Sequence, residues 1–423
     1  MAQLTDDCFA FSGPLLPLAD MERLIEERIT PVTEVEQVPL DAALGRIVAA
    51  EVIAGEDLPP FDNAAVDGFA VRHADLVPGA ESRLGIAGCV MAGQNAHPIV
   101  AGSAIRIFTG APMPEGADTV FMQEDCRLEG DAVVMPAGLD LGANRRLAGE
   151  DLRKGAVMFP AGRKLTAAGV ALAAAQGLTR LTVRRQLRVA VFSTGDEVVD
   201  PGAGRPSAAI YDANRHLVRG LLNKFGTAVT DLGILRDDPE VLETAIKAAA
   251  AGHDLVITTG GVSTGDADHV RTAIERTGRL VFWRVAIKPG RPVALGVLPA
   301  AGSDHAAVFA GLPGNPGAVY VTFVRVVWPL LMRLAGGLPR RLVALPVRAT
   351  FAYRKRKGRR EYVRVFLRTG DDGTVEVVKF PQDGAGVITS LTETDGLVEL
   401  GEEVTAVTPG ATVGFLSHAV LTE

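Results

Sequence analysis

Three short apolar segments of this chain each end in a polar, glycine-rich loop, and this repeated pattern constrains the fold more than any other feature. The segments are Arg188–Phe192, Leu255–Ile257 and Ala306–Phe309, and each has the length and composition of a buried strand. In an open parallel sheet, the loops that follow the strands meet at one edge and form the ligand crevice. The pattern therefore predicts an α/β domain in which three loops meet at one site.

The loop after the central segment has the composition of an anion-binding turn. Gly260, Gly261 and Gly265 can adopt positive φ and bring bare backbone N–H groups close to a ligand. Asp266 and Asp268 follow, and such carboxylates either cap the next helix or hold Mg²⁺ beside bound phosphates. The other two loops supply Ser193, Thr194, Gly195 and Glu197, and then Pro313, Asn315 and Pro316. Together these residue types suit a phosphorylated ligand.

Two cations follow another strand-like segment, Phe282–Ile287, on a proline-stiffened turn. Lys288 supplies a point charge, whereas Arg291 offers a planar fork that can bind an oxyanion through two hydrogen bonds. A pair of solvated surface cations is the alternative interpretation. Combined with the three loops, this turn predicts a site for phosphates and an oxyanion.

The length and charge of the chain limit the classes of protein to which it can belong. A chain of 423 residues is too long for one hydrophobic core and predicts three or four domains. With 48% hydrophobic and 22% charged residues, its composition is that of an ordinary globular protein. A net charge of −7 disfavours a general nucleic-acid or membrane-surface protein, which leaves a small molecule as the expected partner.

The cysteines and the apolar segments favour a cytoplasmic protein. The three cysteines lie far apart and form no C-x-x-C pattern, so neither a zinc site nor a disulfide is expected. An acidic N-terminus without a basic and then apolar segment argues against a signal peptide. The most apolar stretch, Val319–Leu334, is interrupted by arginines and a proline and predicts a buried helix instead of a membrane span.

In the first half of the chain, two helical segments flank a β-rich region. Leu18–Ile29 has the pattern of an amphipathic helix, and Thr166–Leu178 is Ala-rich with Thr166 as its N-cap. Between them, short alternating runs indicate strands, and two polar loops carry Asp67 and Thr109. The predicted domains are an elongated helical domain in two pieces (1–50 and 151–185), a β-rich inserted domain (51–150), an α/β domain (186–335) and a C-terminal β-barrel domain (336–423).

The C-terminal region contains the most basic run of the chain, Arg354–Arg360. Such a run is usually solvated, and it can also imitate a nucleic-acid-binding patch. The alternating segment that starts at Glu361 indicates a hairpin that directs Arg359 or Arg364 toward a site. Frequent turns between the remaining strand-like segments predict a small barrel or sandwich.

Three familiar catalytic signatures do not occur in the sequence: the Walker A, G-x-G-x-x-G and H-E-x-x-H patterns. The predicted site instead combines backbone N–H groups, carboxylates and cations. By themselves, these residues indicate phosphoryl or nucleotidyl chemistry with Mg²⁺.

Six motifs follow one another along the chain. They are Phe61–Val71, Thr109–Pro114, Ser193–Glu197, Gly260–Gly265 with Asp268, Lys288–Pro292 and Gly311–Pro316. Together, and in this order, they resemble the motifs of the molybdopterin molybdenumtransferase family, the molybdenum-insertion enzymes also represented by the E domain of gephyrin. The resemblance covers nearly the whole chain.

This resemblance implies a homodimer of elongated four-domain subunits. Each site would lie between the α/β domain of one subunit and the β-rich insertion of the other. The implied substrates are adenylylated molybdopterin and molybdate, and Mg²⁺-dependent hydrolysis of the adenylate would release molybdenum cofactor and AMP. A molybdopterin adenylyltransferase and molybdoenzymes are the implied protein partners.

The resemblance also implies roles for individual residues. Catalytic roles fall on Asp67, Asp151, Glu197, Asp237 and Asp268, of which Glu197 and Asp268 would hold Mg²⁺. Substrate binding falls on Thr109, Ser193, Thr194, Gly195, Gly260, Gly261, Ser263, Lys288, Arg291, Pro313, Asn315, Pro316 and Arg359. Within that set, molybdate recognition would use Ser263, Lys288, Arg291 and Arg359.

Two positions depart from the pattern of the family. Arg284 stands where Lys is common and keeps the charge, whereas Ala385 stands where a Ser hydroxyl is usual near the oxyanion.

Two other functions of the protein remain as alternatives. A molybdopterin adenylyltransferase shares the α/β domain but needs neither the β-rich insertion nor the C-terminal domain, so the chain length disfavours it. The other is a non-enzymatic dimeric scaffold of the gephyrin E-domain type.

Overall fold

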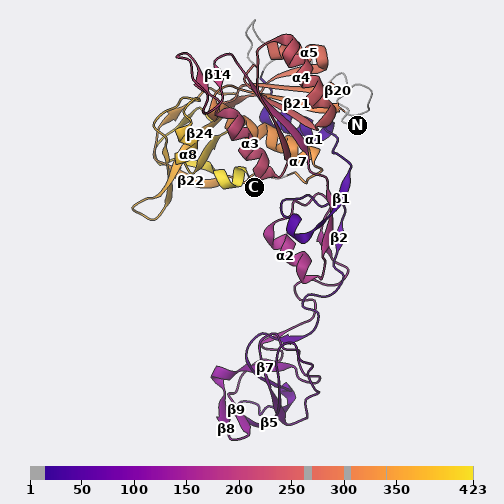
Figure 1. Ribbon diagram of the computed structural model, residues 1–423. Helices are drawn as coiled ribbons and strands as arrows, with labels where there is room; N and C mark the ends of the chain where they lie inside the picture. The colour runs from indigo at the N-terminus through magenta and orange to yellow at the C-terminus, as the bar shows by residue number, and fades with distance from the viewer. Residues whose placement is uncertain (1–14, 262–268, 300–305, 340, 423) are drawn as a thin grey trace. The chain divides into compact units, whose positions relative to one another are not determined.

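The computed structural model describes residues 15–261, 269–299, 306–339 and 341–422, which form two compact units (Figure 1). The smaller unit consists of Ala50–Ala161 and Ala167–Leu181. The larger unit comprises the other described residues.

A six-stranded sheet forms the centre of the larger unit. Its order is β16 (Ala228–Leu235), β13 (Arg188–Thr194), β17 (Leu255–Thr259), β21 (Ala306–Leu312), β20 (Pro292–Pro299) and β18 (Arg279–Arg284). The first four strands are parallel, and the last two run antiparallel to their neighbours. The three predicted strands are thus confirmed as the adjacent parallel strands β13, β17 and β21, and the loops that follow them leave the sheet at one edge.

Helices cover both faces of this sheet (Figure 1). Side chains alternate along a strand, so Val189 and Val191 of β13 enter one core with α3 (Asn214–Phe225) and the helix over Pro316–Leu334. Ala190 and Phe192 enter a second core with α4 (Pro239–Gly252) and α5 (His269–Thr277). Burial on both faces is typical of a parallel sheet.

The helix over Pro316–Leu334 is the core element that the sequence indicates. It consists of α6 (Pro316–Thr322), a π-helical segment (Phe323–Val327) and α7 (Trp328–Leu334). Among the described residues it is the one helix long and apolar enough to cross a membrane by length and composition, but 89% of that stretch is buried within the protein. Helix α1 (Leu18–Arg28) packs on α7 through Leu18, Met21 and Ile25.

Five strands close into a C-terminal barrel. In order around the ring they are β24 (Arg360–Thr369), β25 (Val375–Lys379), β22 (Leu345–Ala349), β28 (Thr412–Ser417) and β26 (Gly396–Leu400), which returns to β24. The predicted barrel is therefore present. A sixth strand, β19 (Ile287–Lys288), pairs in parallel with β24 and joins the Lys288 turn to the barrel. Two short helices, α8 (Thr389–Glu393) and α9 (His418–Leu421), complete this region.

The segment after the basic run forms a hairpin, as the sequence indicates, because β24 and β25 pair antiparallel with Thr369 opposite Val375. The strand before the run, β23 (Tyr353–Arg354), pairs with β27 (Ala406–Val407). The strand after it, β24, pairs with β25 and β26, because closure of the barrel occupies both of its edges. The basic run consequently connects two different sheets.

The smaller unit contains a mixed six-stranded sheet. Its order is β7 (Thr119–Met122), β4 (Gly68–Val71), β6 (Ser103–Ile107), β5 (Ser82–Val90), β9 (Ala132–Met135) and β8 (Arg127–Glu129). Two short pairs join β2 (Val52–Ile53) to β11 (Val157–Phe159) and β3 (Asn63–Ala64) to β10 (Arg145–Arg146). Separate apolar clusters pack on the two faces of the sheet.

The two helices predicted to form one elongated helical portion belong to different units. Helix α1 is part of the larger unit, and α2 (Ala167–Ala175) is part of the smaller one. Short strands lie in the same stretches of sequence, β1 (Val35–Pro39) and β12 (Arg180–Arg184). Their β-branched residues, such as Val35 and Val183, favour an extended chain over a helix.

Candidate functional site

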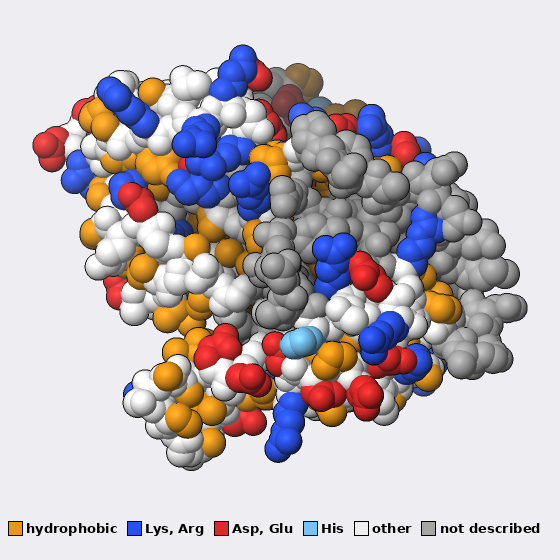
Figure 2. Space-filling view, turned by 90° about the horizontal axis from the view of Figure 1, so that it is seen from above, with side chains coloured by type: hydrophobic (Ala, Val, Ile, Leu, Met, Phe, Trp, Pro, Cys, Tyr) orange, Lys and Arg blue, Asp and Glu red, His pale blue; other side chains and the backbone are white. Residues whose placement is uncertain are grey.

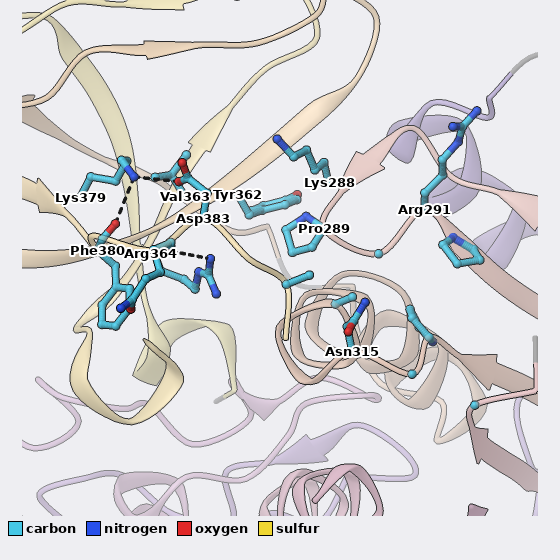
Figure 3. Close-up of a pocket in the computed structure, with 18 of the residues that line it drawn as sticks. Lys288, Pro289, Arg291, Asn315, Tyr362, Val363, Arg364, Lys379, Phe380 and Asp383 are labelled. Atoms are coloured by element: carbon cyan, nitrogen blue, oxygen red, sulfur yellow. Dashed lines mark hydrogen bonds and ion pairs between the residues drawn. The ribbon is translucent and has the colours of Figure 1, made fainter. Parts of the chain in front are cut away.

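A cavity of about 540 Å³ lies in the larger unit at the ends of the parallel strands. Figure 3 shows Lys288, Arg291 and Asn315 around it, with Arg364 and Lys379 from the barrel on the other side. Its lining residues come from three loops of the sheet, from the turn after β19 and from the barrel: Glu197, Gly260, Gly261, Lys288–Pro292, Pro313–Asn315, Ala318, Tyr353, Tyr362–Arg364, Lys379, Phe380, Gln382, Asp383 and Ala385.

The glycine turn after β17 is packed too closely for any side chain. Gly261 has φ +64°, and a Cβ there would lie 2.5 Å from Val270 Cγ2 and 2.8 Å from Thr194 Cγ2. The backbone N–H of Gly260 donates a 3.1 Å hydrogen bond to the carbonyl of Leu312 at the end of β21. The loops after β13, β17 and β21 therefore meet, as the sequence pattern predicts.

Glu197 reaches the cavity from the loop after β13. Its carboxylate folds back over Gly195, which has φ +134° and whose missing Cβ would lie 2.7 Å from Glu197 Oε2. Behind it, Ser193 Oγ and Thr259 Oγ1 are 2.8 Å apart and buried. Glycine at position 195 thus provides the room that the Glu197 carboxylate occupies.

Asp237 lies near this loop in an electrostatically unfavourable position. Burial is the main cause that raises the pKa of Asp237; the charge of His269 and the nearby Thr194 hydroxyl act against this rise, and the negative charges of Asp196 and Glu197 add to it. Its Oδ1 and the Thr194 hydroxyl are buried without a hydrogen-bond partner among the described residues. A carboxylate oxygen in this state is suited to receive a proton or a cation.

No group of three or more His, Cys, Asp and Glu side chains with metal-site geometry occurs among the described residues. Mg²⁺, however, commonly uses one or two carboxylates together with substrate phosphates and water. Glu197 at the cavity wall and the unpartnered Oδ1 of Asp237 are oxygen donors of that kind. The donor set present therefore fits Mg²⁺ bound together with a phosphorylated ligand.

A buried carboxylate, Glu361, organises the cations at the cavity. Its Oε2 lies 3.3 Å from Lys288 Nζ and accepts a 2.7 Å hydrogen bond from the Tyr353 hydroxyl, while Oε1 accepts a 2.7 Å bond from Arg359 Nε. Burial acts to raise the pKa of Glu361, but the bonds from Tyr353 and Arg359 and the charge of Lys288 hold it below the usual range. Glu361 was not among the predicted site residues, although an acid directly after a basic run was a signal for it.

Arg364 positions the segment that carries Ala385. It is 7% exposed and donates to the carbonyls of Gly384 (2.9 Å) and Gln382 (3.1 Å) and to Ser390 Oγ (2.8 Å). The Ala385 carbonyl accepts a 2.8 Å bond from the backbone N–H of Gly317. Sequence reasoning missed this role, because the segment meets Arg364 only through the closed barrel.

Asp67 and Thr109 form a hydrogen-bonded pair in the smaller unit. The N–H and hydroxyl of Thr109 donate to Asp67 Oδ1 at 2.7 and 2.8 Å. They lower the pKa of Asp67, the backbone N–H first and the hydroxyl second. The two loops adjoin because β4 and β6 pair antiparallel, with Gly68 opposite Ile107.

Asp151 is exposed in the same unit, and its side chain has no hydrogen bond or ion pair to a described residue.

The structure brings only some of the predicted site residues to the cavity. Those that line it are Glu197, Gly260, Gly261, Lys288, Arg291, Pro313 and Asn315. Others belong to the adjoining segments of the larger unit: Ser193, Thr194, Gly195, Asp237, Pro316 and Arg359. Ser263 and Asp268 lie outside the described residues.

The charge of the surface is uneven. One face carries a group of adjacent Lys and Arg side chains (Figure 2). A chain with a net charge of −7 thus still presents a locally basic surface. Such local basic regions raise the concentration of anions nearby.

Family models cover most of the chain. The model described as "MoeA N-terminal region (domain I and II)" matches residues 16–177. A second, "Probable molybdopterin binding domain", matches residues 190–333, and "MoeA C-terminal region (domain IV)" matches residues 346–417.

Relatives and solved structures match over similar lengths. A molybdopterin molybdenumtransferase of Haemophilus influenzae is 38% identical over 407 residues, which are 94% of this chain and 98% of that protein. One of Nostoc sp. is also 38% identical, over 72% of this chain and 70% of that protein. Two crystal structures of a molybdopterin biosynthesis MoeA protein from Pyrococcus horikoshii align with TM-scores of 0.76 and 0.70, at 26% and 31% identity. Each alignment covers 96% of this chain and at least 99% of the other. Agreement of this extent in sequence and in structure shows that the chain belongs to the molybdopterin molybdenumtransferase family.

Proposed function

We propose that this protein inserts molybdenum from molybdate into adenylylated molybdopterin and releases molybdenum cofactor and AMP. The observation that carries the proposal is the cavity at the ends of three parallel strands. Glycine backbone, four cationic side chains and two carboxylates line the same space of about 540 Å³. That volume lies within the roughly 300–1,000 Å³ of typical ligand pockets.

The glycine turn and two of these cations suit the anionic parts of these substrates. Gly260 and Gly261 present bare backbone, which can approach phosphate oxygens closely. Arg291 is exposed at the cavity and has no hydrogen bond or ion pair to another described residue, so its planar fork is available to an oxyanion. Lys288 shares its charge with Glu361. We assign molybdate to the Lys288–Arg291 turn, with Ser263 and Arg359 as further ligands.

Glu197 and Asp268 would hold Mg²⁺. When bound, the cation would neutralise charge on the phosphates of the adenylate. Hydrolysis adds one water molecule across the phosphoanhydride that joins AMP to molybdopterin. Because its pKa is raised, Asp237 is a stronger base than a solvated aspartate and is suited to accept a proton from that water.

We further propose a cytoplasmic homodimer with the four domains bounded near residues 50, 150, 185 and 335. Asp67, Thr109 and Asp151 would act on the same substrate as the cavity of the partner subunit. The support is the resemblance of the motifs to the family together with the family match. A molybdopterin adenylyltransferase would supply the substrate, and molybdoenzymes would accept the product.

The direct test is to incubate the purified protein with adenylylated molybdopterin, molybdate and Mg²⁺ and to measure AMP and metal-bound pterin. We expect both products, and we expect neither when EDTA replaces Mg²⁺. Absence of AMP in the complete mixture contradicts the proposal. Consumption of ATP with plain molybdopterin would instead identify an adenylyltransferase.

A further inference from the structure

One buried arginine connects three carboxylates from three segments near Glu197. Arg215, in the first turn of α3, is 4% exposed. Its Nε lies 2.9 Å from Asp212 Oδ2, its Nη1 lies 2.6 Å from Asp231 Oδ2, and its Nη2 contacts Asp200. The backbone N–H of Arg215 also donates a 3.0 Å bond to Asp212 Oδ1.

Two of these carboxylates belong to the loop that carries Glu197. Short strands β14 (Val198–Val199) and β15 (Ile210–Tyr211) pair in this loop, and Asp200 and Asp212 follow directly after them. The N–H of Ile210 donates a 2.7 Å bond to the carbonyl of Glu197 itself. Arg215 therefore fixes both arms of the loop, and only two residues separate Glu197 from Asp200.

The neighbouring residue holds a second wall of the cavity. Asn214 Nδ2 donates a 2.7 Å hydrogen bond to the carbonyl of Gly314, which precedes Asn315 in the cavity lining. Consecutive residues of one helical turn thus bind two of the three strand-end loops.

Stability by itself is a poor explanation for this network. Buried ion pairs recover little more than the cost of removing their charges from water, and apolar packing often stabilises as well or better. A guanidinium, in contrast, fixes the directions of its hydrogen bonds, which apolar packing does not.

We propose that Arg215 and Asn214 are positioning residues that hold Glu197 and the Pro313–Pro316 loop at the spacing that the substrate requires. The proposal rests on the proposed function. A displacement of about 1 Å in a catalytic group can reduce the rate by roughly 100-fold, so the network has a measurable kinetic effect.

Asp200→Asn is the main test, because the Asp200 side chain is 56% exposed and its neutralisation leaves no new buried charge without a partner on that side. We expect kcat for AMP release to fall by about 10- to 100-fold with an unchanged melting temperature. Hydrogen exchange of residues 195–212 should become faster. Arg219→Met is the matched control, since Arg219 contacts Asp231 at 2.7 Å but neither arm of the loop, and it should leave kcat near the wild-type value.

A double-mutant cycle separates positioning from a general structural effect. If Asp200 and Arg215 act through Glu197, then Asp200→Asn should change the rate by less than about twofold in a Glu197→Gln background. If the rate losses of the two single variants multiply in the double variant, the proposal is overturned. It is also overturned if the wild type is active and Asp200→Asn has the same rate. A wild type that forms no AMP refutes the proposed function instead.

For the second loop, Asn214→Ala should raise KM by about three- to tenfold, the effect of one lost hydrogen bond, and an unchanged KM removes Asn214 from the proposal.

Discussion

At the scale of single residues, Glu361 determines how much positive charge the cavity presents. It lies 1% exposed between Lys288 and Arg359 and forms an ion pair with each. Neither cation therefore delivers a full charge to a ligand, whereas Arg291 has no such partner among the described residues. Selectivity for an oxyanion should depend on this division of charge.

Replacing Lys288 by Ala should weaken molybdate binding more than AMP binding. A charge-assisted hydrogen bond contributes about 1.5–3 kcal/mol, which corresponds to roughly a 10- to 100-fold loss of affinity. Isothermal titration of each ligand measures the two effects. The matched control is Lys357→Ala, because Lys357 is 67% exposed, forms an ion pair with Glu403 and is not among the residues that line the cavity. Equal losses for molybdate and AMP would mean that Lys288 holds the phosphates.

Thr109→Val tests the hydroxyl that helps to keep Asp67 ionised. The hydroxyl and the N–H of Thr109 lower the pKa of Asp67, so the variant, which keeps only the N–H, should have a higher Asp67 pKa. A lowered pKa keeps the carboxylate charged as pH falls, and the acid limb of kcat/KM should therefore move to higher pH in the variant. Carboxyl NMR titration of Asp67 provides the direct measurement. An unchanged titration with Thr109→Val contradicts the assigned cause.

At the scale of elements, the sequence predicts the sheet better than the barrel. The strands around Val191, Ile257 and Val308 are continuous apolar runs that end in glycine loops, and local pattern suffices to identify them and their common edge. The contribution of Tyr353 and Glu361 to the cavity depends on pairing between β19 and β24, which are more than seventy residues apart in sequence. Local pattern contains no information about that contact.

The pairing of the strands around the basic run shows the same limit. Alternation after the basic run correctly predicts a strand at β24, but it does not identify the partner strand. Closure of the barrel gives both edges of β24 to β25 and β26, and β23 pairs elsewhere. Strand existence is thus a local property of this sequence, whereas strand partnership is a property of the closed barrel.

Gly261→Ala tests the close packing of the β17 loop against β13 and α5. A methyl group there would overlap the side chains of Val270 and Thr194, and φ +64° is unfavourable for alanine. We expect a loss of roughly 1–3 kcal/mol in the free energy of unfolding, measured by urea denaturation. Gly220→Ala in α3 is the control, since nothing lies within 4 Å of its added Cβ, and a helical Gly→Ala change should stabilise by up to about 1 kcal/mol. Equal stability of both variants would show that the loop repacks freely.

At the scale of the whole molecule, the candidate residues are divided between the two units. The Asp67–Thr109 pair belongs to the smaller unit, and Glu197, with the cavity, belongs to the larger one. A substitution can therefore inactivate the residues of one unit and leave the site residues of the other unit unchanged. Mixing of subunits can therefore decide whether the two sets act on one substrate across a dimer.

Asp67→Ala and Glu197→Ala subunits, each with only residual activity alone, should regain activity when mixed if the proposed homodimer shares its sites. In a mixed dimer, one site combines both substitutions, whereas the other combines the intact Asp67 of one subunit with the intact Glu197 of its partner. At full exchange about half of the dimers are mixed and each has one whole site, so roughly a quarter of the wild-type rate of AMP release should return. Native mass spectrometry verifies the exchange, and each variant mixed with itself is the control. If exchange is complete and the rate stays at that of the separate variants, Asp67 and Glu197 act within a single chain, and the shared-site proposal is refuted while the proposed reaction stands.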